Sequence, residues 1–121
     1  ALELLEHCKD RYNMHLITNG FETTQQMKLC NSGIDHYFKA LITSEKSFSM
    51  KPKREIFDYA LQTTGAALHQ SIMIGDALAI DVLGAKNVGM DQVYYNPYKI
   101  PHTEQPTYEV AHLAELKSIF I

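Results

Sequence analysis

Ser71-Ile-Met-Ile-Gly-Asp76-Ala-Leu-Ala-Ile-Asp81 is a short apolar run that ends in glycine and a carboxylate, with a second carboxylate five residues later. Buried parallel strands are nearly continuous apolar runs, so residues 72–74 favour a strand covered on both faces of a sheet. A glycine after them permits a sharp exit from the strand. The stretch therefore predicts an interior strand of an α/β fold, with Asp76 at the tip where such sheets bind ligands.

The residues after Asp76 predict a helix that brings the second acid back to the same place. Residues 79–86 are mostly good helix formers, which puts Asp81 in the first turn, on the side that faces Asp76. Two close carboxylates need a neutralising cation, and Mg²⁺ prefers one or two carboxylates with waters and a substrate phosphate. Asp76 and Asp81 are therefore a candidate magnesium site. In the alternative interpretation, both acids only stabilise the N-terminal end of the helix.

The composition limits the class of protein. The chain has 121 residues, of which 45% are hydrophobic, and a formal net charge of −3, which suits one ordinary domain without the basic excess of nucleic-acid-binding proteins. No apolar run reaches the about 20 residues that span a bilayer. We therefore expect a cytoplasmic protein with neither a nucleic acid nor a membrane as its partner.

Strand-like and helix-like segments alternate along the chain. The pattern predicts strands at 14–18, 38–43, 72–74, 92–95 and 108–110, and helices at 1–12, 22–31, 52–64, 79–87 and from 112 onward, with a polar loop at 44–50. This spacing is typical of βαβ units. The expected fold is a three-layer α/β/α, Rossmann-like parallel sheet.

Polar residues follow three successive predicted strands. Thr18 and Asn19 lie at the tip of the first strand, Lys51 follows the second, and Asp76 with Asp81 follow the third. The tips of parallel strands share one edge, where a hydroxyl and amides can hold phosphate oxygens, a lysine can neutralise their charge and carboxylates can hold a metal. Taken singly, Thr18 is more often a helix-capping hydroxyl and Lys51 part of a solvated basic run. Together they predict a phosphate site.

These motifs resemble those of the haloacid dehalogenase (HAD) superfamily. Leu16-Ile-Thr18-Asn19, Lys51-Pro52 with the following Glu55-Ile-Phe57, and GDALAID at 75–81 with the following Gly84-Ala-Lys86 look like its second, third and fourth motifs, in order across nearly the whole chain. The C-terminal residues 95–97 and 106–109 are similar to the branch that contains cytosolic pyrimidine nucleotidases. The resemblance implies an HAD-like core domain.

The resemblance also implies a function and residue roles. Thr18 and Asn19 would bind the transferred phosphoryl group, Lys51 would offset charge on the phosphate and the attacking carboxylate, Asp76 would ligate Mg²⁺, and Asp81 would support the site through water or by fixing Lys51. The family attacks phosphorus with an aspartate and forms an aspartyl-phosphate that water hydrolyses. We therefore expect a magnesium-dependent phosphatase that acts on a small phosphorylated metabolite, with a nucleoside monophosphate as the first guess.

One part of the family pattern is not in this sequence. Residues 1–121 contain no pair of aspartates separated by one residue after an apolar strand, so neither the nucleophile nor the general acid can be assigned. In the family that strand lies between the Thr18 strand and the Asp76 strand, and the substrate-enclosing cap follows it. We expect residues 1–121 to be the C-terminal part of a single core domain, with 1–12 from the junction with the cap. Its missing N-terminal segment would be its partner, and the chain alone would be inactive.

Other functions compete with the phosphatase. A haloacid dehalogenase of the same superfamily would need no metal. An inactive module that binds phosphate or a partner protein would need no nucleophile. A two-component receiver also places acids, a threonine and a lysine at strand tips, but its acids precede the lysine, whereas here the lysine precedes the acids.

Overall fold

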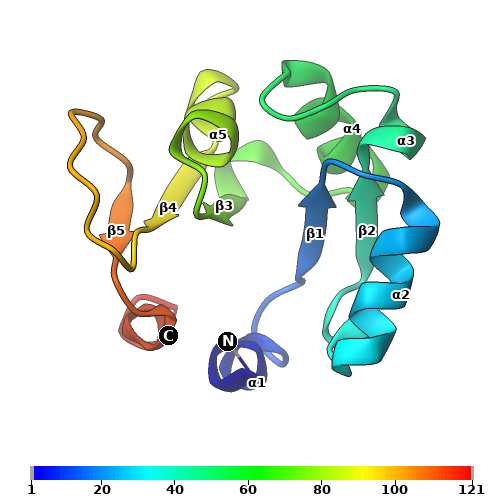
Figure 1. Ribbon diagram of the computed structural model, residues 1–121, viewed down its shortest axis with the longest axis horizontal. Coiled ribbons are helices and arrows are strands. Elements are labelled where there is room, and N and C mark those ends of the chain that lie inside the picture. The colour runs from blue at the N-terminus through cyan, green and yellow to red at the C-terminus, as the bar shows by residue number, and fades with distance from the viewer. Residues whose placement is uncertain (1, 121) are drawn as a thin grey trace.

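The computed structural model describes residues 2–120 and shows parallel sheets flanked by helices (Figure 1). The helices are α1 (Leu2–Cys8), α2 (Glu22–Ser32), α3 (Ser44–Ser47), α4 (Arg54–Thr64) and α5 (Leu83–Asn87). The strands are β1 (His15–Thr18), β2 (Ala40–Thr43), β3 (Ile72–Gly75), β4 (Asp91–Tyr95) and β5 (Tyr108–Val110). Short 3₁₀ helices are η1 (Asp35–Tyr37), η2 (Leu68–Gln70) and η4 (Leu113–Ser118), and η3 (Leu78–Val82) is a π-helical turn. The predicted α/β class is confirmed.

The strands form two separate sheets. In the first, β1 pairs with β2, so that Thr18 lies opposite Thr43. In the second, the order is β3-β4-β5, and every strand pair in both sheets is parallel. Within residues 2–120, β1 and β3 each pair with one strand only, and their other edges face the space between the sheets (Figure 1).

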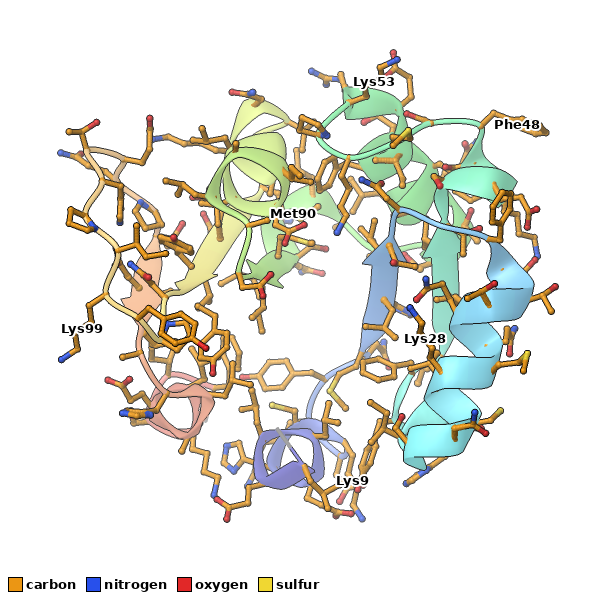
Figure 2. All side chains as sticks on the ribbon, in the orientation of Figure 1. Lys9, Lys28, Phe48, Lys53, Met90 and Lys99 are labelled. Carbon is orange, nitrogen blue, oxygen red and sulfur yellow. The ribbon has the colours of Figure 1, made fainter. Side chains whose placement is uncertain are left out.

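A cavity of about 840 Å³ occupies the space between β1 and β3. Its walls include residues 15–17 of β1 and 72–74 of β3, and α1 and Phe120 also line it. Figure 2 shows the side chains of both sheets arranged around this open centre. The prediction that residues 72–74 are buried on both faces is therefore wrong: none is fully buried, and Ile74 is 37% exposed, because β3 has a neighbour on one side only.

Helix α4 supplies the core that holds the two sheets together. Its Ile56 and Phe57 are fully buried and pack with Ile42 of β2 and with residues of α5. Half-buried Ile17 of β1 and Met73 of β3 pack against the same cluster. The two sheets are thus joined by side-chain packing around α4, because no strand pairing joins them in the described part of the chain.

A second apolar cluster joins the two ends of the chain. Leu4 and Cys8 of α1 pack with Val93, Val110 and Leu116. The ring of His7 is hydrogen-bonded to the carbonyl of Phe120 at 2.6 Å. The helix predicted at 1–12 ends at Cys8, so it is shorter than expected, and Ala1 lies outside the described residues.

Three further boundaries differ from the sequence predictions. The segment 44–50 holds the short helix α3, because the Thr43 hydroxyl caps it by accepting the Lys46 N–H at 3.1 Å. Helix α4 begins at Arg54 instead of Pro52. The helix predicted at 79–87 begins as the π-helical turn η3 and becomes α-helical only at Leu83.

None of the helices within residues 2–120 combines the length and apolar character needed to cross a membrane.

His15 should make the stability of the fold depend on pH. Burial, helped by the nearby charge of Lys39, lowers the pKa of His15 below 6.5, and no group within residues 2–120 hydrogen-bonds its Nδ1. The unfolded chain then binds more protons than the folded one, so this contribution is present above pH 6.5 and is lost as the pH falls through the folded-state pKa. We expect His15→Leu to flatten the decline of unfolding free energy below pH 6.5, as measured by urea unfolding across a pH series. An unchanged slope would contradict this.

Candidate active site

A buried ion pair joins the segments that follow β2 and β3. Lys51 Nζ donates to Asp81 Oδ1 at 2.6 Å, and the two side chains are only 12% and 8% exposed. The other carboxylate oxygen of Asp81, Oδ2, accepts the backbone N–H of Ala77 at 3.4 Å. Both oxygens of Asp81 are therefore engaged, and the arrangement holds the Lys51 ammonium in one place.

The tight turn η3 brings Asp81 back to the end of β3. The Asp81 N–H donates to the Ala77 carbonyl at 2.8 Å, which closes the turn directly after the strand. Gly75, the last residue of β3, leaves the space that the Asp81 side chain fills: a Cβ at position 75 would lie 2.6 Å from Asp81 Cγ. The glycine is therefore required by the close approach of the strand backbone to Asp81.

Gly75→Ala should destabilise the protein by about 1–3 kcal/mol, because the new methyl group has no room beside Asp81. Urea unfolding of the variant measures the cost. In an Asp81→Gly background the obstructing atoms are gone, so the same change should cost much less. Equal costs in the two backgrounds would show that the methyl group does not clash with Asp81.

Asn19 connects the loop after β1 to Lys51. Its side-chain Oδ1 accepts the Lys51 N–H at 2.8 Å, and its Nδ2 donates to the Lys51 carbonyl at 3.3 Å. These two bonds fix the backbone from which the Lys51 side chain extends. Thr18 immediately precedes Asn19 as the half-buried last residue of β1. The structure thus brings the segments of Thr18, Lys51 and Asp81 together.

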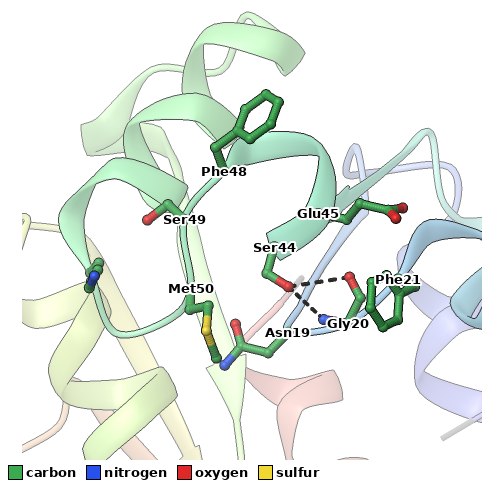
Figure 3. Close-up of a pocket in the computed structure, with 9 residues that line it drawn as sticks. Asn19, Gly20, Phe21, Ser44, Glu45, Phe48, Ser49 and Met50 are labelled. Carbon is green, nitrogen blue, oxygen red and sulfur yellow. Dashed lines mark hydrogen bonds between the residues drawn. The ribbon is translucent and has the colours of Figure 1, made fainter.

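Ser44 holds the same loop from the other side, a role that sequence reasoning missed. Its hydroxyl accepts the Gly20 N–H at 2.8 Å and donates to the Gly20 carbonyl at 3.2 Å (Figure 3). Ser44 directly follows β2, so it lies at the same sheet edge as Thr18. The only feature of the sequence that pointed to this role was the position of Ser44 directly after a predicted strand. Many serines at the ends of strands hold no loop in this way.

Asp76 lies at the exit of β3 with an exposed side chain, one residue before Ala77. Residues 2–120 hold no group of three or more His, Cys, Asp or Glu side chains that could bind a metal. Mg²⁺ needs only one or two protein carboxylates when waters and a phosphate complete its shell. Asp76 fits that requirement as a single direct ligand, whereas Asp81 is already bonded through both oxygens and fits a positioning role better.

Known proteins resemble the chain over nearly its whole length. A family model described as haloacid dehalogenase-like hydrolase matches residues 1–95. Pyrimidine 5'-nucleotidase YjjG of Escherichia coli is 35% identical over 125 residues, which cover 98% of this chain and 54% of YjjG. YfnB of Bacillus subtilis, named a HAD-hydrolase, is 31% identical over 122 residues, which cover 98% of this chain and 52% of YfnB.

Solved structures agree with this comparison. A crystal structure of YfnB bound to magnesium matches with a TM-score of 0.94 at 31% identity, and covers 99% of this chain and 54% of that one. The chain thus spans about half the length of the relatives it matches. The resemblance expected from the three motifs is confirmed, and since the family model covers most of the sequence and the fold agrees, the chain belongs to the haloacid dehalogenase-like hydrolases.

Proposed function

We propose that this chain forms part of a magnesium-dependent phosphomonoester hydrolase, with a nucleoside monophosphate as its first candidate substrate. The observation that carries the proposal is the buried Lys51–Asp81 pair beside the Thr18–Asn19 loop, since a fixed ammonium at strand tips suits a phosphate. The names of the relatives, which include pyrimidine 5'-nucleotidases and a glyceraldehyde 3-phosphate phosphatase, support phosphate esters as the substrate class.

Each residue of the proposed site has a distinct role. The Thr18 hydroxyl and the backbone amides that follow it bind the phosphoryl oxygens, and Lys51 offsets their charge. Asp81 and Asn19 are positioning residues that fix the side chain and the backbone of Lys51. Asp76 would hold Mg²⁺, which when bound neutralises phosphate charge and orients the ester. The attacking aspartate would come from polypeptide outside residues 1–121 and form an aspartyl-phosphate that water hydrolyses.

The proposal includes a strand that fills the space between β1 and β3. Each of these strands has an unpaired edge within residues 2–120, and unpaired backbone groups are costly when buried. The walls of the intervening cavity of about 840 Å³ include apolar side chains of both strands, at residues 16–17 and 72–74. An apolar parallel strand would satisfy both edges, and its tip would emerge beside Lys51 and Asp76. We propose that the missing N-terminal segment of the same protein supplies it.

The experiment compares the product of the complete reading frame that encodes this chain with residues 1–121 alone. The complete product should release phosphate from a pyrimidine nucleoside monophosphate, lose this activity in EDTA and regain it with Mg²⁺, while residues 1–121 alone should be inactive. Turnover that survives chelation, with halide release from a 2-haloalkanoate, would replace the phosphatase by a dehalogenase. A complete product that hydrolyses neither substrate would leave only a binding role.

A further inference from the structure

A second pocket opens beside the site, between the loop after β1 and the segment that follows β2 (Figure 3). We propose that it holds the leaving group of the phosphoester, and that this group is a flat aromatic ring system. This inference rests on the proposed phosphatase function and specifies its substrate. The pocket has a volume of about 540 Å³, within the range of small-ligand sites. Its lining comprises Asn19, Gly20, Phe21, Ser44, Glu45, Phe48, Ser49, Met50 and Lys53.

The pocket is continuous with the proposed phosphate site. Asn19 lines the pocket and also forms both hydrogen bonds to the backbone of Lys51. Gly20 lines it as well and is bonded to Ser44 in the same wall. The pocket therefore adjoins the loop to which the proposal assigns the phosphate.

The chemistry of the walls favours an aromatic ligand. Phe21, Phe48 and Met50 are all exposed, and Phe48 is 95% exposed. Three exposed, large apolar side chains therefore line one pocket, where an apolar ligand could cover them. Phenyl rings and a thioether both make favourable contacts with a flat aromatic ring.

Phe48 has a backbone conformation that is unusual for a bulky residue. Its φ of 57° is left-handed and ends helix α3, a position that glycine adopts without the steric cost paid by a bulky side chain. The ring gains almost no burial in return, since it projects from the end of α3 (Figure 3). Strain of this kind is typically retained where the side chain has a function.

The test uses the complete reading-frame product and two substrates that share the phosphate group but differ in the leaving group. For Phe48→Gly, the KM for 4-nitrophenyl phosphate should rise about tenfold, as expected for the loss of one stacking ring, while kcat stays unchanged. The KM for glycerol 3-phosphate should not change. Tyr98→Ala is the matched control, because Tyr98 is an exposed aromatic residue that does not line the pocket.

The substitution also separates binding from folding. Glycine suits a left-handed position, so the Tm of Phe48→Gly should equal or exceed that of the wild type, and a rise in KM could not come from unfolding. Phe21→Ala, which leaves the α3 end untouched, should give the same selective rise. A shift of equal size for both substrates, or no shift in either variant, would overturn the inference.

A binding measurement distinguishes failure of this inference from failure of the proposed function. In calorimetric titrations, Phe48→Gly should weaken the binding of phenyl phosphate about tenfold and leave the binding of inorganic phosphate unchanged. If Phe48→Gly weakens the binding of phenyl phosphate alone but the wild type shows no turnover, the hydrolase proposal fails and the aromatic pocket stands. If the wild type hydrolyses phosphate esters but the variant binds both ligands normally, the pocket inference fails and the hydrolase stands.

Discussion

Lys51→Met should lower phosphate ester hydrolysis by the complete protein by about a hundredfold to a thousandfold, the cost of removing one group that stabilises charge in the transition state. It should also destabilise the fold. The substitution leaves the Asp81 carboxylate, with its side chain only 8% exposed, without its cation. Breaking a buried pair from one side typically costs about 3–5 kcal/mol, because the remaining charge stays buried.

The double variant Lys51→Met/Asp81→Asn separates these two effects. Both charges are then gone, so most of the lost unfolding free energy should return, while hydrolysis should stay as low as in Lys51→Met. Urea unfolding and phosphate release measure the two quantities. Lys28→Met is the control, since Lys28 is exposed on α2 away from the site. A single variant with normal turnover would remove Lys51 from the proposed mechanism.

Phe57→Ala should destabilise the protein by about 3–5 kcal/mol, the usual cost of truncating a fully buried phenylalanine. Phe57 is the largest of the completely buried side chains, and it packs in the cluster that joins β2 to α5. The ring also lies against α5 at Gly84, where a Cβ would approach it to 3.0 Å. Because packing around α4 joins the two sheets, loss of this ring should weaken the fold as a whole.

The same urea unfolding series should include Phe57→Leu, which keeps most of the apolar volume and should cost clearly less than the alanine variant. Both variants retain Lys51 and Asp81, so any residual folded fraction should keep the ion pair. A cost below about 1 kcal/mol for Phe57→Ala, as in a surface substitution, would show that the cluster does not hold the sheets together.

Most of the secondary structure could be predicted from local patterns. The strand at 108–110 has the predicted bounds, and α2 begins at Glu22 as expected and ends just before Gly33, whose left-handed conformation stops the helix. These features depend on residues close in the chain. The predictions that failed depend on distant contacts. Helix α4 does not begin at Pro52, and β3 is only partly buried because one of its edges pairs with no strand within residues 2–120.

Only part of the candidate site could be predicted from the sequence. Thr18, Lys51 and Asp76 were predicted to lie at one sheet edge because each lies at or beyond the tip of a parallel strand, and the order of the motifs identified the family. The bonds between them could not be predicted. Asn19 and Lys51 are 32 positions apart, and Lys51 and Asp81 are 30 apart, so which atoms meet depends on how the helices pack.

The sequence by itself therefore determined the α/β class, the family and the set of polar residues predicted at the strand tips. Hydrophobic periodicity and turn-forming residues are local properties of the chain, so they can be recognised without the tertiary structure. The tertiary structure alone decided that both oxygens of Asp81 are engaged, that Asn19 holds the Lys51 backbone, and that Phe48 stands exposed in a left-handed conformation beside a pocket. Those features arise from close approaches between distant segments, such as Asp81 against Gly75, which no local pattern encodes.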